Sequence, residues 1–344
     1  MGEQFYTSEL MEFKALPAVS GVRLHDERGG MEATIAPPFG GGLSSLRVRW
    51  AGEWVETLYR ANEFQPTEGW RGQAPLLWPA VGRNYTAEQL TAIREGEKPP
   101  RGAYCYREST YPMPIHGFVM DLAWELMDHG ADEKGAWATC ALTSDDYTRD
   151  FYPFDFSLEA TYILSQRRLT LCLVVAAAVE NREAMFFSLG NHLTLRLPFT
   201  AAGRFEECVL RAPTRTKFDL TPESLLAGTR QELDLSVGMP LSREELHNLV
   251  IGAFAPDEVW VELRDPHSFG FRIAQREVPA GVEAPLKSQP EHFYFVFYGS
   301  AEQGFFCPEP WYGGPNSLNT QQGVIWLPPG ETFTWEMEIA WLED

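Results

Sequence analysis

The 344-residue sequence lacks any run of about 18 apolar residues, the minimum that a membrane-spanning helix needs. The stretch from Leu169 to Val179 is too short and has the composition of a strand. The N-terminal segment 1–7 carries an acidic residue but no apolar core, which argues against a secretory signal, and position 6 lacks the Ser or Thr of a myristoylation site. We therefore expect a cytoplasmic protein with no membrane partner.

Cysteine is scarce, and its spacing excludes two kinds of site. The five cysteines are an odd number with no Cys-x-x-Cys pair, which argues against a disulfide framework and against a zinc site. They are Cys105, Cys140, Cys172, Cys208 and Cys307. We expect reduced thiols that are mostly buried. The sequence also lacks a glycine-rich phosphate loop and a cluster of His and carboxylate residues at metal spacing, so we expect no metal and no organic cofactor.

Basic residues are outnumbered, since 28 Lys and Arg face 48 Asp and Glu, for a net charge of -20. Binding to nucleic acid relies on clustered Lys and Arg to replace counterions, so a nucleic-acid partner is excluded. The same charge weakly disfavours a phosphorylated substrate, although a local basic pocket could still bind one.

Alternation with a period of two is the recurring pattern, in short runs bounded by Gly, Pro and Asp. Apolar residues alternate with polar ones from Phe333 to Trp341 and from Phe156 to Leu164, as in strands with one buried face. Leu169 to Val179 should form the hairpin partner of the second run. Segments Phe293 to Tyr298 and Val259 to Leu263 are typical of further strands.

Helical signals are few, and the best is the capping-box pattern Thr86-Ala-Glu-Gln89, which should open a short helix that ends before Pro99-Pro100. Strands spread evenly from Gly40 to Trp341, with no low-complexity linker between them. The fold class that we predict is mainly β, a large antiparallel β-sandwich with few short helices. We expect residues 1–344 to form one domain.

Four separated segments each place an ionisable side chain beside Gly, Pro or an aromatic ring, where the backbone turns sharply and a small ligand can be held. They are Trp78-Pro-Ala-Val-Gly-Arg83-Asn-Tyr, Met113-Pro-Ile-His116-Gly-Phe, Ser188-Leu-Gly-Asn-His192 and Cys307-Pro-Glu309-Pro-Trp311-Tyr-Gly-Gly. Together they suggest an acid, a base and two binding groups.

Each of these side chains also has a purely structural interpretation. His116 should lie in a tight turn and His192 at a strand end, where either ring could simply be hydrogen-bonded. Glu309 next to Trp311 would be desolvated, which would raise its pKa and suit it to act as a base, but it could instead be a solvated turn residue. Arg83 could bind a pair of hydroxyls or form a surface salt bridge.

In order along the chain, these segments resemble the motifs of the aldose 1-epimerase (galactose mutarotase-like) superfamily. Pro75-Leu-Leu-Trp-Pro79-Ala-Val-Gly82-Arg83, Ile115-His116-Gly117-Phe118, Gly190-Asn-His192 and Glu309-Pro-Trp-Tyr-Gly313 match its four motifs. The resemblance covers about Gly40 to Trp341. The stretches Tyr152-Pro-Phe-Asp-Phe156 and Leu241-Ser-Arg243 are similar to a subgroup of bacterial mutarotase-like proteins of uncertain sugar preference.

The resemblance implies a β-sandwich of the galactose mutarotase type (a supersandwich) whose concave face binds a pyranose. It implies an isomerase that interconverts the α and β anomers of a free aldohexose by opening and reclosing the ring. By position Glu309 would be the base and His192 the acid. His116 and Arg83 would hold the sugar. Aromatic residues would cover its apolar face, and the candidates are Trp78, Trp311 and Tyr312.

The sequence also departs from the family pattern. Leu193 replaces the usual proline after the third motif, and Asn248 stands in a loop that often holds an aspartate, so we expect the contact of Asn248 with the sugar to differ from that in relatives. A non-catalytic sugar-binding or sensing protein therefore remains an alternative. A hexose-6-phosphate epimerase is another, and its phosphate would need a basic cluster, for which the candidates are Arg101, Arg107, Arg211 and Arg215. The sequence is compatible with a monomer or a homodimer.

Overall fold

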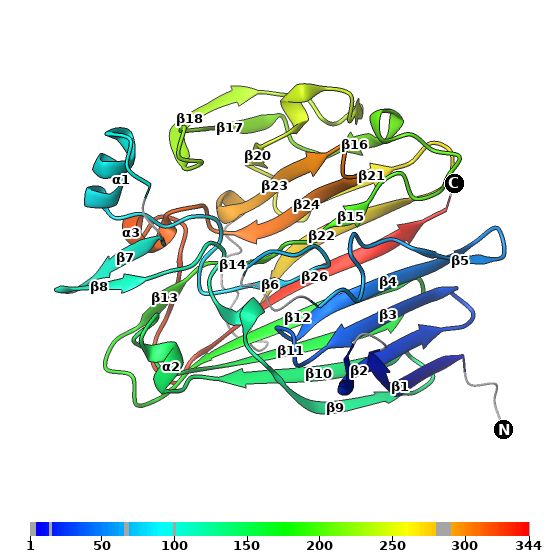
Figure 1. Cartoon of the computed structure of the whole chain (residues 1–344), viewed down its shortest axis with the longest axis horizontal. Helices are drawn as coiled ribbons and strands as arrows, with labels where there is room; N and C mark the ends of the chain where they lie inside the picture. The colour runs from blue at the N-terminus through cyan, green and yellow to red at the C-terminus, as the bar shows by residue number, and fades with distance from the viewer. Residues whose placement is uncertain (1–4, 14–15, 65–68, 99–100, 280–289, 344) are drawn as a thin grey trace.

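The structure is a computed structural model that describes residues 5–13, 16–64, 69–98, 101–279 and 290–343. In this part of the chain, antiparallel strands form three large sheets and two small ones (Figure 1). The prediction of a mainly β fold with few short helices is confirmed. No helix in these ranges is long and apolar enough to cross a membrane.

The first sheet has five strands in the order β1-β2-β3-β4-β5, and the largest has nine in the order β19-β16-β21-β22-β26-β12-β11-β10-β9. The strands of the first are β1 (Tyr6–Phe13), β2 (Leu16–Asp26), β3 (Met31–Ala36), β4 (Gly42–Trp50) and β5 (Glu53–Glu56). Those of the second are β9 (Glu125–Ala131), β10 (Ala136–Thr143), β11 (Phe156–Ser165), β12 (Arg168–Ala177), β16 (Val209–Arg211), β19 (Met239–Pro240), β21 (Trp260–Arg264), β22 (Gly270–Val278) and β26 (Thr332–Leu342).

The third large sheet has the order β18-β17-β20-β23-β24-β14-β6, with β15 also paired to β24. Its strands are β6 (Leu76–Leu77), β14 (Leu189–Asn191), β15 (Leu195–Arg196), β17 (Thr216–Leu220), β18 (Leu226–Glu232), β20 (Leu249–Gly252), β23 (Phe293–Ser300) and β24 (Phe305–Tyr312). The two small sheets pair β7 (Ala103–Tyr106) with β8 (Ser109–Pro112) and β13 (Met185–Phe187) with β25 (Ile325–Leu327).

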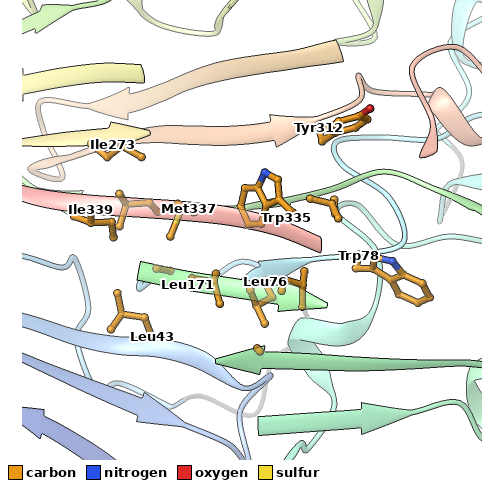
Figure 2. Packing of buried hydrophobic residues seen from close by; sticks show 14 of the residues in the cluster. Leu43, Leu76, Trp78, Leu171, Ile273, Tyr312, Trp335, Met337 and Ile339 are labelled. Atoms are coloured by element: carbon orange, nitrogen blue, oxygen red, sulfur yellow. The ribbon is translucent and has the colours of Figure 1, made fainter. Parts of the chain in front are cut away.

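The strands predicted from alternation are confirmed, and their buried residues form the core. In β26 the alternate positions from Phe333 to Ile339 are buried, and in β11 those from Phe156 to Leu164. β11 and β12 form the expected hairpin, whose two-residue loop at Gln166 and Arg167 has positive φ at both positions, the geometry of a type I′ turn. Figure 2 shows β26 side chains packed beside residues of β12, β6 and β4.

The expected helix α1 (Ala87–Arg94) begins at Thr86, and both bonds of the capping box are present. Pro99 and Pro100 lie outside the described residues. The other helices are single turns, α2 (Asp146–Arg149) and α3 (Ser317–Thr320). The five cysteines are free, and three of them are buried as expected.

The five-stranded and eight-stranded sheets lie next to each other over the nine-stranded sheet (Figure 1). Two isolated bridges, Leu43 to Ala74 and Leu58 to Leu195, join the five-stranded sheet to the eight-stranded sheet. Buried residues of all three sheets belong to one continuous hydrophobic cluster. This packing fixes the positions of β24 and β14. Polar residues described next lie within β24 or directly after β14.

Candidate active site

A cavity of about 390 Å³ opens on the eight-stranded sheet, and its volume is in the range of small-molecule sites, about 300 to 1,000 Å³. All six site residues predicted from the sequence line it, although they come from five separate segments. They are Arg83, His116, His192, Asn248, Glu309 and Trp311. The fold therefore brings the predicted residues together. Their chemical roles stay predictions.

Glu309 lies in the middle of strand β24 and is only 2% exposed, so the solvated-turn interpretation is wrong. Two prolines flank Glu309, and a central strand normally excludes proline because it cannot donate to a neighbour. Here β24 pairs with β23 throughout, but on its other side β15 reaches only Phe306 and β14 begins only at Trp311. The prolines occupy the interval between these two partners, where no strand of the described residues pairs with β24, so their lack of an amide hydrogen breaks no ladder.

His192 directly follows β14, at the strand end that the sequence predicts. Its backbone N–H donates to the Pro75 carbonyl, 3.0 Å away. A β-carbon at Gly190 would lie 2.6 Å from the Pro310 oxygen, so only glycine lets β14 approach β24 this closely. As a result the His192 Nε2 lies 3.5 Å from the Glu309 Oε1.

His116 lies in the tight turn that the sequence predicts, with φ of 68° followed by Gly117 at 77°. The Gly82 N–H donates to the His116 Nδ1 at 3.1 Å, and the His116 N–H donates back to the Gly82 carbonyl at 2.9 Å. A neutral His116 therefore carries its proton on Nε2. Its ring meets those of His192 and Trp311 edge to face.

The remaining predicted residues form the wall and rim. Trp311 is 4% exposed, and its indole N–H donates to the Glu309 Oε2 at 3.2 Å, so its polar edge rather than its face meets the carboxyl group. Arg83 is exposed, and its guanidinium donates to the Tyr85 hydroxyl. Asn248 is exposed at φ 54°, a left-handed conformation that asparagine tolerates better than most residues.

Burial controls the charge of the three central groups. Desolvation raises the pKa of Glu309 well above its ordinary value, and the Trp311 hydrogen bond only partly opposes this rise. Desolvation lowers the pKa of His192 well below its ordinary value, and the neighbouring His116 adds to the effect. The pKa of His116 falls to about 3, through desolvation and the charge of Arg83. The cavity floor therefore favours uncharged groups that can exchange protons.

His116, His192 and Glu309 lie close enough to suggest a metal centre, since one ligand atom of each lies within 4.8 Å of the others. Sequence spacing did not reveal this cluster, because its members come from distant segments. However, the Gly82 N–H leaves the His116 Nε2 protonated, and a protonated nitrogen cannot ligate. Within the described residues the His192 Nδ1 has no partner, whereas metal-bound imidazoles usually donate from their second nitrogen. The cluster fits proton transfer better than metal binding.

Two of the three aromatic candidates lie elsewhere. Trp78 is fully buried in the core against Tyr152 and Phe156, and Tyr312 lines a different cavity. Three aromatic residues that the sequence analysis did not single out for the site, Trp70, Phe297 and Tyr298, line it instead.

None of the four arginines considered for a phosphate lines the cavity. Arg107 pairs with Glu183, Arg211 with Glu262 and Arg215 with Asp234, and the Arg101 guanidinium lies over the Phe151 ring. Arg83 is the one Lys or Arg among the residues that line the cavity.

Known proteins resemble this chain both in sequence and in structure. The chain is 31% identical over 123 residues to an Escherichia coli protein named "Putative glucose-6-phosphate 1-epimerase", a match that spans 35% of this chain and only 33% of that protein. A solved protein of Synechocystis sp. PCC 6803 superposes with a TM-score of 0.72 at 20% identity, over 94% of this chain and 96% of the other.

A second solved structure, a galactose mutarotase related enzyme from Lactobacillus acidophilus, has a TM-score of 0.70 at 22% identity, over 92% and 96% of the two chains. These structural matches show that the fold is that of galactose mutarotase, as the resemblance implied. The profile of the family described as Aldose 1-epimerase matches residues 23–340. The chain therefore belongs to the aldose 1-epimerase family.

Proposed function

We propose that this protein is a mutarotase that interconverts the α and β anomers of a free aldohexose. The observation that supports this most strongly is the 3.5 Å distance between the His192 Nε2 and the Glu309 Oε1 on the floor of the cavity. The C1 hydroxyl and the ring oxygen of a pyranose are bonded to the same carbon. An acid and a base that serve these two oxygens must therefore lie close together, as these two groups do.

The proposed reaction starts from the ion-paired form of the two groups, an anionic Glu309 beside a protonated His192, which burial makes the less populated form. From this form Glu309 takes the proton of the C1 hydroxyl while His192 delivers a proton to the ring oxygen. The C1–O5 bond breaks and a C1 aldehyde forms. Rotation about the C1–C2 bond presents the other face of the aldehyde, and the reverse proton transfers close the ring. After ring opening Glu309 is protonated and His192 neutral, the uncharged forms that burial favours. The protein thus stabilises the state in which the aldehyde is free to rotate.

The other lining groups would fix the sugar in register. His116 can donate from Nε2, because the Gly82 N–H holds its Nδ1 as an acceptor. Arg83 and Asn248 lie exposed at the rim, where hydroxyl groups distant from C1 would arrive. Trp311 lines the cavity beside Glu309 and is the candidate for packing against the apolar face of the ring. This arrangement needs no cofactor.

A phosphorylated hexose is the second candidate, because the Escherichia coli relative bears the name of a glucose-6-phosphate epimerase. Among the residues that line the cavity, Arg83 is the one cation, and the chain has a net charge of -20. Phosphate recognition generally uses several charge-assisted hydrogen bonds. The lining therefore favours the free sugar over its phosphate.

The test is the rate at which fresh α-anomers of glucose, galactose and other aldoses reach equilibrium, followed by polarimetry. Glucose 6-phosphate is followed in parallel by proton NMR. We expect acceleration with free aldoses, and a loss of about 10²-fold or more in Glu309→Gln or in His192→Asn. If the protein accelerated mutarotation of glucose 6-phosphate but of no free aldose, the sugar phosphate would be its substrate. If no sugar were accelerated but one bound with similar affinity to wild type and Glu309→Gln, the protein would be a non-catalytic binder.

A further inference from the structure

Trp70 makes a contact with the proposed acid that the reaction described above does not use. Its indole stacks on the His192 imidazole, with ring centroids 5.3 Å apart and planes inclined by 26°. A tryptophan face attracts a cation, most strongly where water is excluded. His192 is 5% exposed, so an imidazolium formed there has little solvent to stabilise it.

Trp70 is also linked by hydrogen bonds to the main chain of His192. The indole N–H donates to the Thr194 Oγ1 at 3.0 Å, and that hydroxyl donates to the His192 carbonyl at 3.0 Å. Thr194 is fully buried, and the Cys307 thiol lies against the same hydroxyl. Trp70 therefore contacts the His192 ring directly and is linked to the His192 carbonyl through the Thr194 hydroxyl.

A single carboxylate holds Trp70 in place from both sides. The N–H of Gly69, the preceding residue, donates to both oxygens of Asp121, at 3.0 and 3.1 Å. Arg71, the following residue, pairs with the same Asp121 at 2.6 Å. The indole packs further on Phe305 and Tyr298. These contacts restrict the orientation of Trp70 before any ligand binds.

We propose that Trp70 is a positioning residue that holds the His192 ring against Glu309 and stabilises its imidazolium form. This inference rests on the proposed role of His192 as the acid. Among the described residues, the groups around His192 that carry or can carry charge are Glu309, His116, and Arg83 beside His116. Glu309 is the one that can attract an imidazolium, and burial favours its uncharged form. In the substrate-free protein, where Glu309 is uncharged, the Trp70 face remains to stabilise the imidazolium.

The test compares Trp70→Leu with Trp70→Phe. Leucine removes the aromatic face, so we expect the midpoint of the His192 titration to fall by about one pH unit and kcat to fall about tenfold, with KM changed less than about threefold. The titration is followed by NMR of substrate-free protein labelled with nitrogen-15 in histidine. Phenylalanine keeps a face and should restore both values to within about threefold of wild type.

Thr194→Val separates the hydrogen-bonded chain from the stacking and should lower kcat without moving the His192 titration. Trp326→Leu is the matched control, since Trp326 is 50% exposed on β25 and lies outside the cavity lining, and should change neither value. An unchanged His192 titration in Trp70→Leu, with KM raised instead, would make Trp70 a surface for the sugar and overturn the proposal. Because the titration needs no substrate, it decides this even if the protein accelerates no mutarotation.

Discussion

At the scale of single residues, the roles that we propose for Glu309 and His192 depend on the opposite shifts of their pKa values. Burial raises the pKa of the carboxyl and lowers that of the imidazole. Below the lowered pKa of His192 both groups are protonated, and above the raised pKa of Glu309 both are deprotonated. Only the state between these limits contains one proton donor and one acceptor.

This pairing predicts a broad, bell-shaped dependence of kcat/KM on pH. The acid limb should lie below pH 6.5, because the imidazole pKa is lowered from that value. The alkaline limb should lie well above pH 4.5, because the carboxyl pKa is raised from that value. The measurement is mutarotation from about pH 4 to about pH 10, corrected for the spontaneous rate at each pH. An acid limb at or above pH 6.5 would contradict the burial of His192 as the controlling effect.

Six of the residues that the sequence analysis proposed for the site line one cavity. Five of them belong to short motifs with Gly, Pro or aromatic neighbours, whereas Asn248 was proposed only from the family resemblance. Trp70 could not be found in this way. Its significance depends on His192 and Thr194, more than 120 positions away, and no local spacing encodes that contact. The only local signal is an aromatic ring between Gly69 and Arg71.

At the scale of elements, the turn at Gly117 decides where His116 points. Gly117 has φ of 77°, and a β-carbon there would lie 2.0 Å from the Trp78 carbonyl oxygen. The same two residues form a parallel bridge. A larger residue would push the His116 turn away from β6, the strand just before Trp78, and so away from the cavity.

Gly117→Ala should therefore cost about 2 to 5 kcal/mol of unfolding free energy, from the left-handed backbone and the overpacking together. Urea denaturation measures this value, and kcat should fall as well. Gly96 is the matched control, with φ of 97° and nothing within 4 Å of an added β-carbon. Gly96→Ala should cost only about 1 to 2 kcal/mol and leave kcat unchanged. Equal losses in the two variants would show that packing at Gly117 is unimportant.

The strands that the sequence predicted well are those whose two faces differ. In β26 and β11 the buried face repeats at every second position, which is visible in the sequence. All eight residues of β24 are buried, so its two faces do not differ and no alternation appears. Pro308 and Pro310 are also typical of a turn. The strand could be recognised only from its partners β23, β14 and β15.

At the scale of the whole molecule, we propose that the chain folds as one domain. Buried residues from all three large sheets belong to one hydrophobic cluster, and isolated bridges join the five-stranded sheet to the eight-stranded sheet. Separate domains would each need their own core.

One domain predicts a single cooperative unfolding transition. Far-ultraviolet circular dichroism, tryptophan fluorescence and loss of mutarotation should have coincident midpoints in urea, and the calorimetric and van't Hoff enthalpies should agree. Unfolding of the five-stranded sheet at a lower urea concentration than the rest would contradict the proposal.

The interval in β24 between β14 and β15 has one more consequence. A strand with an open side normally exposes amide hydrogens that attract another extended peptide. Pro308 and Pro310 have none, and the Pro310 oxygen already faces Gly190. We infer that the floor of this cavity cannot recruit a peptide by strand addition. The opening in the sheet thus offers no proline amide hydrogen to an incoming strand, and the Glu309 side chain between the two prolines stays available to a small ligand.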